Sequence, residues 1–386
     1  MNINMSKYLD KLNQKAQKVL GHSSGSNNDN APPIPFNTKP STSLSPNPNA
    51  TLPDPQTFTT DLNQKWKITK LGPIYSSSIP RIGWDKGRTS TLSGTTFWNF
   101  GDVVSLDGPM KNGFCMGAAW YANPNNILEV DTRGCSNVAG WEFAKPHESD
   151  PKPLGGNEGV EHWGMDTSNI AEVEPGVGVG FAWVIHRNTV GKEVYQGLGV
   201  LRVTLGKDCP VAERVGPLVT GPDELQMGLM TIINAEGYIY TYSNGGITGI
   251  IVGRAKVADA VDTSKYEFLR HDGNWVQGIP KSNDVGYGIK TIGQEQAKIH
   301  SDGQGSIMFN KYLNKYMLFT CMFGHATSFY MSDTPYGPWT PEYRLLDEPG
   351  YGINVHPSMS EDHRILYISS GTMENIISMW KVEFGY

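Results

Sequence analysis

The feature that most restricts the fold is a series of short, strand-like segments separated by turn residues. From residue 67 to the end of the chain, β-branched and aromatic runs are bounded by Gly, Asn, Asp and Pro. Long helical periodicity is missing from this part of the sequence. The pattern predicts an all-β fold with strands at residues 67–75, 114–121, 178–186, 195–205, 227–233, 238–242, 250–257, 307–310, 316–323, 328–332, 365–369 and 377–384.

A weak internal repeat narrows the architecture. A strand, a polar turn and a Tyr-rich strand recur at residues 233–240, 309–319 and 359–367. Successive hairpins of one design are typical of propeller blades. The strand-rich part would supply about 65 residues to each of five blades, or about 46 to each of seven. We therefore expect a five-bladed β-propeller, with seven blades or a β-sandwich with long loops as alternatives.

The first 60 residues differ in composition from the rest. Within residues 1–20, Leu9, Leu12, Ala16 and Val19 lie at helical spacing, which predicts a short amphipathic helix. Such a helix could dock weakly to a membrane surface or to a partner, but a marginal helix on a tail is the simpler interpretation. Residues 21–60 are rich in Ser, Asn and Pro, which predicts a disordered linker before a propeller domain at 61–386.

Charge and cysteine usage exclude several classes of protein. The net charge is −6 and the sequence has no basic stripe, which argues against a nucleic-acid partner. No run of apolar residues is long enough to predict a transmembrane segment. Without a recognisable signal peptide, the localisation is unknown: cytoplasmic by default, with non-classical secretion open. Cys115, Cys135, Cys209 and Cys321 form no metal-binding spacing, so we expect free thiols and no metal or cofactor. A disulfide between Cys115 and Cys135 is the alternative.

The stretch from residue 83 to 102 is the leading candidate for a catalytic site. Residues 88–93 and 95–100 read as two strands joined by a Ser-Gly turn. Asp85 precedes the first strand and Asp102 follows the second, so the hairpin would bring both acids to one edge of a sheet. Two such acids suit acid/base catalysis, with Arg88 nearby to bind a ligand. The alternative is that both aspartates are turn formers.

A second polar cluster lies at residues 158–166. Glu161, His162, Trp163 and Asp166 fall within nine residues, and a Trp beside an acid is suited to stacking a sugar ring. A solvated loop with a core Trp is the alternative. Among the other candidates, His186 and Arg187 end a strong strand, Glu295 precedes a later strand, and His356 precedes a proline. Each of these is also compatible with a structural role.

The leading stretch resembles a known family. Its pattern is Gly-x-Asp-x-Gly-x-Thr from Gly83, followed by Gly-x-x-x-Trp-x-Phe-Gly-Asp from Gly94. This is similar to the opening of a domain family that includes bacterial endo-D-arabinanases, which are five-bladed propellers. Residues 305–312, 332–339 and 351–357 resemble later phrases of such glycosidases. The resemblance covers about residues 67–386, implies that Asp85 and Asp102 are the catalytic pair, and departs at Val103, where Thr or Ser is usual.

These observations predict a glycoside hydrolase with a two-carboxylate mechanism and a carbohydrate substrate. The predicted catalytic residues are Asp85, Asp102 and Glu161, and the separation of the acid pair would decide between retention and inversion. An aromatic wall of Trp84 or Trp98 would raise the pKa of the proton donor. Predicted substrate-binding residues are Arg88, Trp84, His162, Trp163, Asp166, His186, Arg187, Glu295 and His356. The alternatives are a lyase for uronate glycans that uses His and Arg, or a non-catalytic carbohydrate- or protein-binding propeller.

Overall fold

The computed structural model describes residues 66–105, 114–135, 138, 143–150, 160–188, 193–292, 294–301, 304–347, 350–372 and 375–385. Within these ranges the regular elements are strands and short 3₁₀ helices, so the all-β class is confirmed for the described chain. The helix expected in residues 1–20 and the linker expected at 21–60 lie outside the described residues. Across the described ranges, no helix has the length and apolar character needed to cross a membrane.

Five antiparallel sheets of four or five strands make up most of the molecule. The first contains β3 (Arg88–Leu92), β4 (Thr95–Asn99), β7 (Ala119–Ala122) and β8 (Val130–Asp131). The second contains β10 (Ala171–Glu174), β11 (Val177–Asn188), β12 (Glu193–Leu205) and β13 (Pro210–Arg214), with β9 (Val160–Thr167) paired to β11. The third contains β14 (Thr231–Ala235), β15 (Tyr238–Asn244), β16 (Ile250–Lys256), β17 (Glu267–Leu269) and β18 (Trp275–Gln277).

The other two large sheets come from the last third of the chain and from its first described strand. The fourth contains β21 (Gly305–Asn310), β22 (Lys315–Cys321), β23 (Thr327–Ser332) and β24 (Tyr343–Leu346). The fifth contains β25 (Tyr351–Val355), β26 (Ile365–Gly371), β27 (Ile377–Phe384) and β1 (Trp66–Pro73). Smaller sheets pair β2 (Ile82–Trp84), β5 (Asp102–Ser105) and β6 (Phe114–Met116), and β19 (Lys290–Thr291) with β20 (Gln294–Lys298). The 3₁₀ helices are η2 (Gly246–Thr248), η3 (Val257–Asp259), η4 (Thr263–Lys265) and η5 (Pro357–Met359).

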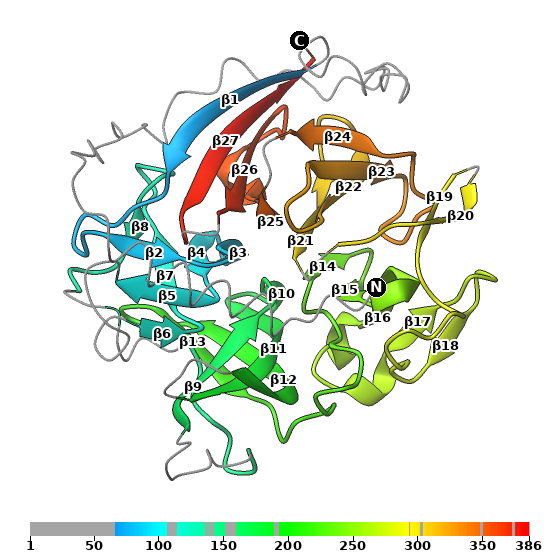
Figure 1. The fold of residues 1–386 in the computed structure, drawn as a ribbon, viewed down its shortest axis with the longest axis horizontal. Coiled ribbons are helices and arrows are strands. Elements are labelled where there is room, and N and C mark those ends of the chain that lie inside the picture. The colour runs from blue at the N-terminus through cyan, green and yellow to red at the C-terminus, as the bar shows by residue number, and fades with distance from the viewer. Residues whose placement is uncertain are drawn as a thin grey trace.

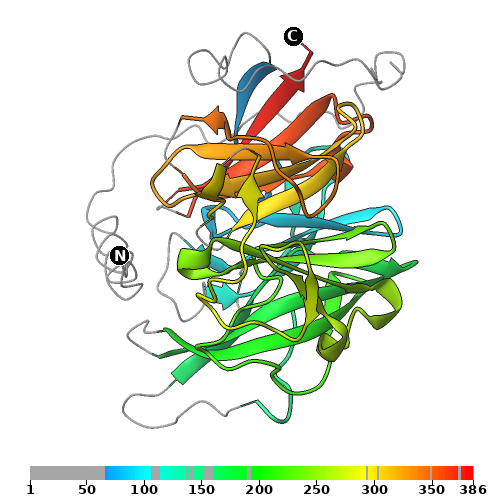
Figure 2. The ribbon, with the colours of Figure 1, turned by 90° about the vertical axis from the view of Figure 1, so that its right-hand side faces the viewer.

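The large sheets form a propeller-like ring (Figure 1). One strand of each large sheet lies innermost, and these five strands contact one another in a closed cycle: β3 with β10, β10 with β14, β14 with β21, β21 with β25, and β25 with β3. The side view shows the twisted sheets following one another along the molecule (Figure 2). The innermost strands are far apart in sequence, and the closed cycle brings them together around the centre of the ring.

The ring closes through the pairing of the first and last described strands. β1 runs antiparallel to β27, from Trp66 opposite Phe384 to Pro73 opposite Ser378, with a bulge between Lys70 and Gly72. Trp66 and Phe384 are buried between the fourth and fifth sheets, where the Trp66 ring packs against both Phe384 and Phe329. Because the two ends of the described chain share one sheet, this pairing holds the ring together without a covalent link.

Most predicted strands coincide with observed ones, but two differ. The segment 114–121 is divided between β6 and β7, in different sheets, because Gly117 turns the chain with φ +71°. The segment 227–233 forms a strand only from Thr231, since the residues before it make turns. All four cysteines are free, with Cys115 and Cys321 buried, so the predicted thiols are confirmed and a disulfide with Cys135 is absent.

Candidate active site

The opening hairpin places Asp85 and Asp102 side by side. β3 pairs with β4 from Arg88 opposite Asn99 to Leu92 opposite Thr95, so both acids lie at the open end. The Asp85 amide donates to the Asp102 carbonyl at 2.7 Å, and the Gly101 amide donates to the Asp85 carbonyl at 2.9 Å. Both aspartates are half-buried and line one small cavity of about 50 Å³. The expected meeting of the two acids is therefore confirmed, while their catalytic roles remain a prediction.

Glycines around Asp85 allow this close approach. A Cβ atom added to Gly101 would lie 3.0 Å from Asp85 Oδ2, so the carboxylate packs directly over the bare backbone. The chain then turns through Lys86 and Gly87, with φ of 69° and 75°. A side chain at Gly87 would also meet Ile377 Cδ1 at 2.7 Å. The turn needs a left-handed backbone and little volume, conditions that favour glycine.

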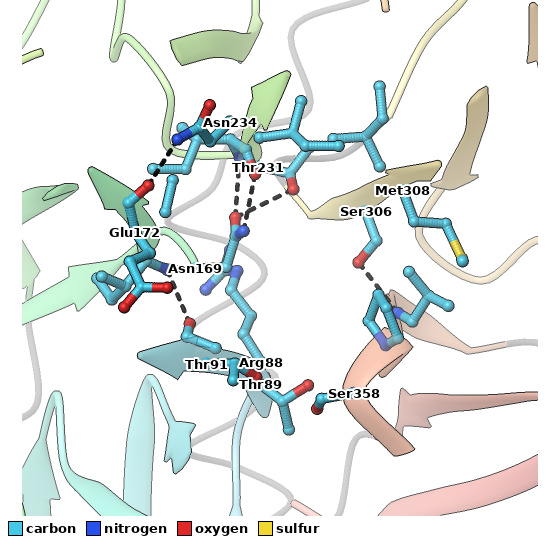
Figure 3. A pocket seen from close by; sticks show the side chains of 18 of the residues that line it. Arg88, Thr89, Thr91, Asn169, Glu172, Thr231, Asn234, Ser306, Met308 and Ser358 are labelled. Atoms are coloured by element: carbon cyan, nitrogen blue, oxygen red, sulfur yellow. Dashed lines mark hydrogen bonds between the residues drawn. The ribbon is translucent and has the colours of Figure 1, made fainter. Parts of the chain in front are cut away.

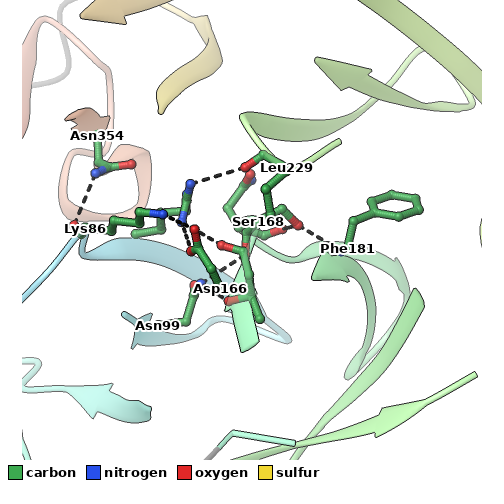
Figure 4. A network of polar contacts seen from close by, with 10 residues as sticks. Lys86, Asn99, Asp166, Ser168, Phe181, Leu229 and Asn354 are labelled. Carbon is green, nitrogen blue, oxygen red and sulfur yellow. Dashed lines mark hydrogen bonds and ion pairs between the residues drawn. The ribbon is translucent and has the colours of Figure 1, made fainter. Parts of the chain in front are cut away.

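Asp166, near the end of β9, brings a third carboxylate to the same cavity. Its Oδ2 forms an ion pair with Lys86 Nζ, and its Oδ1 lies 3.5 Å from Arg88 Nη1 (Figure 4). The Asp166 and Arg88 side chains are 7% and 2% exposed, so this pair is shielded from solvent. Arg88 of the first sheet and Lys86 of the turn before it thus hold an acid of the second sheet.

Arg88 joins three parts of the ring. Its Nη1 donates to the Thr167 carbonyl at 2.6 Å, and its Nη2 donates to the Leu229 carbonyl at 3.2 Å, just before β14 (Figure 4). Burial lowers the pKa of Arg88 to about 10, while the negative charge of Asp85 acts in the opposite direction. The guanidinium therefore remains charged at neutral pH, and it fixes the position of Asp166.

Hydrogen bonds of Asn99 and Ser168 hold the backbone that follows Asp166. Asn99 Nδ2 donates to Thr167 Oγ1 at 2.7 Å and to the Ser168 carbonyl at 2.9 Å. Ser168 Oγ accepts from the Phe181 amide of β11 at 3.0 Å (Figure 4). Each of these polar side chains is buried, so the bonds are made in a low-dielectric interior, where they strongly favour one geometry.

Four further side chains from the second sheet and from β6 line the small cavity. Met116, Met165, Ile185 and Tyr195 complete its lining with the acids and Lys86. A volume of about 50 Å³ holds a water molecule or one substituent, so a sugar ring would have to lie over the mouth.

Two predicted substrate-binding residues belong to the core, and these expectations are corrected. Trp84 is 1% exposed and stacks on Phe100 with ring centroids 4.5 Å apart, so it cannot contact a ligand. His356 is completely buried, and its Nδ1 and Nε2 each form a 2.8 Å hydrogen bond, to Thr89 and Ser369. Burial lowers the pKa of His356 to about 3, so the ring is neutral. Both residues stabilise the fold around the site.

The remaining candidates from the second polar cluster are only partly described. His186 is buried and outside the lining of either cavity, and burial lowers its pKa, with Asp150 opposing the shift. Trp163 is half-buried against the core between the first and second sheets. Glu161 and His162 lie on β9, Arg187 on β11 opposite His162, and Glu295 on β20; their side chains lie outside the described structure.

Sequence reasoning did not include Lys86 or Tyr195 in the site. Lys86 lies between Asp85 and Gly87, and its left-handed backbone gives no clear signal in a single sequence. Tyr195 reaches the cavity from β12, and its ring lies against Trp183 at 4.6 Å. In the described ranges, no group of three or more His, Cys, Asp and Glu side chains has an arrangement suited to a metal ion.

Comparison with known proteins supports the fold. No protein-family model matches the sequence, and no curated protein matches it. A solved structure from Bacteroides ovatus ATCC 8483, described as a "putative hydrolase", is similar with a TM-score of 0.56 and 14% identity, covering 87% of this chain and 97% of that one. A structure described as a glycoside hydrolase has a TM-score of 0.46 and 10% identity, covering 87% and 97%. The GH43_1 enzyme from Xanthomonas citri with xylose has a TM-score of 0.39 and 11% identity, covering 81% and 90%. The similarity to the Bacteroides ovatus structure shows a shared fold and nothing beyond the fold.

Proposed function

We propose that this chain is a five-bladed β-propeller glycoside hydrolase whose catalytic cavity is lined by Asp85, Asp102 and Asp166. Five large sheets, whose innermost strands touch in a closed cycle, support the blade count. The observation that carries the function is the convergence of three carboxylates, from the turn after β2, from β5 and from β9, on one small cavity. The Bacteroides ovatus protein of similar fold, described as a hydrolase, is compatible with this proposal.

The charges around the cavity suggest a division of work among the acids. Asp166 is held by Lys86 and Arg88, which favour its ionised form, so we assign it to positioning and to stabilising positive charge on the sugar. Asp85 and Asp102 are then the working pair. One protonates the glycosidic oxygen as the bond to the anomeric carbon breaks, and the other attacks that carbon or removes a proton from the attacking water.

The separation of the working carboxylates decides the stereochemistry. About 5–5.5 Å between them corresponds to retention through a covalent intermediate, and about 6.5–9.5 Å leaves room for a water and gives inversion. The small cavity suits a single water or a glycosidic oxygen beside the acids. The sugar rings on either side of the bond would lie outside it.

The test is a screen for new reducing ends on a panel of polysaccharides that includes arabinans, fucans and uronate polysaccharides. The wild-type protein is compared with Asp85→Asn and Asp102→Asn. Asp131→Asn is the control, because Asp131 lies on β8, outside the lining of the small cavity.

We expect cleavage of at least one polysaccharide by the wild-type protein and the control, and a loss of about 10³-fold or more in both site variants. Site variants that remain folded and fully active would disprove the assignment of these residues. An unsaturated, ultraviolet-absorbing product would instead indicate elimination, and a protein that cleaves none of the polysaccharides would contradict the proposed activity.

A further inference from the structure

A cavity larger than the acid cavity, and separate from it, lies at the centre of the ring. It has a volume of about 790 Å³, within the range of about 300–1,000 Å³ typical of small-molecule sites. Residues of β3, β10, β14, β21 and β25 and of the segment after β25 surround it (Figure 3). Its far end reaches solvent, since the lining residues Glu174 and Asn234 are exposed.

The lining alternates hydroxyl groups with apolar groups. Thr89, Thr91 and Ser306 supply hydroxyls, while Ile233 and Met308 supply apolar surface (Figure 3). Sugars present the same combination, because hydroxyl groups alternate with C–H faces around each ring. Small-molecule sites commonly combine apolar walls with a few well-placed polar groups.

Two buried polar atoms at the inner end are without a hydrogen-bond partner among the described residues. These are Arg88 Nε, a donor, and Asn354 Oδ1, an acceptor. Both residues line the cavity, and both are at least nine-tenths buried. An unsatisfied buried polar group costs about 1–3 kcal/mol, so a ligand group that reaches either atom is favoured.

Charge argues against an anionic ligand. Arg88 is the single cation among the described lining residues, and its charge is already balanced by Asp166 at 3.5 Å. Glu172 and Glu174 also line the cavity, and Glu172 Oε1 accepts from the Gly176 amide at 2.8 Å. A ligand carrying its own carboxylate would meet these two acids without a free cation to compensate.

We infer that the central cavity is a second binding site, for a neutral polyhydroxylated ligand the size of a mono- or disaccharide. Arg88 and Asn354 contribute polar groups from the buried part of the wall, and Thr91 belongs to the same lining. The inference concerns binding alone and holds whether or not the acid cavity cleaves glycans.

The experiment is ligand-observed NMR titration of the full chain with D-xylose, D-arabinose and maltose, with D-glucuronate as the anionic comparison. Thr91→Trp would fill the cavity. Thr95→Trp is the matched control, because Thr95 lies across the same hairpin, is exposed, and is outside the cavity lining. Asn354→Leu removes the side-chain acceptor at nearly constant volume. If circular dichroism shows that Thr91→Trp is unfolded, the comparison of Asn354→Leu with the wild-type protein becomes the test of the inference.

We expect neutral sugars to bind the wild-type protein and Thr95→Trp alike. The dissociation constant should rise about tenfold or more in Thr91→Trp and about three- to tenfold in Asn354→Leu. The inference is overturned if no neutral sugar binds at about 20 mM, a concentration well above a millimolar dissociation constant. It is also overturned if glucuronate binds more tightly than the neutral sugars, or if both cavity variants bind like the wild-type protein.

Discussion

Replacing Asp166 by Asn is a severe test of the network that holds the acid cavity. The substitution keeps the shape of the side chain but removes the charge that Lys86 and Arg88 share. Arg88 would then be a buried cation, with its pKa already lowered by burial and with fewer compensating charges. The substitution should therefore lower stability much more than the loss of an ordinary surface ion pair.

The magnitude follows from the burial of the partners. Breaking a buried ion pair by removing one partner costs about 3–5 kcal/mol, because it leaves an uncompensated charge. Asn can still accept one hydrogen bond, so we expect a loss near the lower limit, about 3 kcal/mol. A matched control is Asp333→Asn, since Asp333 also pairs with a lysine, Lys315, but its side chain is 80% exposed. The control should cost less than about 1 kcal/mol.

The assay is urea unfolding followed by tryptophan fluorescence at neutral pH, with the free energy of unfolding taken from the linear dependence on urea. Adding Lys86→Met completes a double-mutant cycle, and we expect a coupling energy with Asp166→Asn of about 1 kcal/mol or more. Loss of less than about 1 kcal/mol in Asp166→Asn, equal to that in the surface control, would refute the reasoning.

Two further predictions concern the frame around the site. The pKa of His356 is about 3 in the folded protein and near 6.5 in the unfolded chain, so between these values the unfolded chain binds one more proton. The contribution of His356 to the free energy of unfolding is therefore fully present above pH 6.5 and is lost as the pH falls. We expect the free energy of unfolding to decrease by about 2–3 kcal/mol from pH 6 to pH 4. In urea titrations at these two values, His356→Gln should remove that part of the slope, and an unchanged slope would contradict the assignment. Gly117→Ala should cost more than about 2 kcal/mol, because φ is +71° and the new Cβ would lie 2.2 Å from the Met165 carbonyl oxygen. Gly94→Ala, with φ +79° and open space, should cost only about 1 kcal/mol when both variants are compared by urea unfolding, and equal losses would contradict the steric argument.

Local features of the fold could be predicted from the sequence. The hairpin of β3 and β4 was predictable because alternating residues flank a Ser93-Gly94 turn, where both residues have positive φ. The repeats at residues 233–240 and 309–319 correspond to the innermost hairpins β14–β15 and β21–β22. The third repeat, at 359–367, instead covers the end of η5 and the start of β26. Sequence alone did not indicate the pairing of β1 with β27, since it joins strands from opposite ends of the described chain.

The site was predictable only where it depends on the hairpin. Asp85 and Asp102 lie together because one short turn brings them there. Asp166 joins them through Lys86, 80 residues away, and this contact depends on how the first and second sheets pack. Burial also depends on packing, and for this reason Trp84 and His356 looked like ligand-binding groups in the sequence and lie in the core.

The most direct measurement is a crystal structure of Asp85→Asn bound to an oligosaccharide that the wild-type protein cleaves. The account predicts that the scissile glycosidic oxygen lies at the mouth of the small cavity, within about 3.2 Å of a carboxylate or amide oxygen of residue 85 or 102. An oligosaccharide whose scissile bond lies elsewhere on the protein, away from these acids, would contradict it.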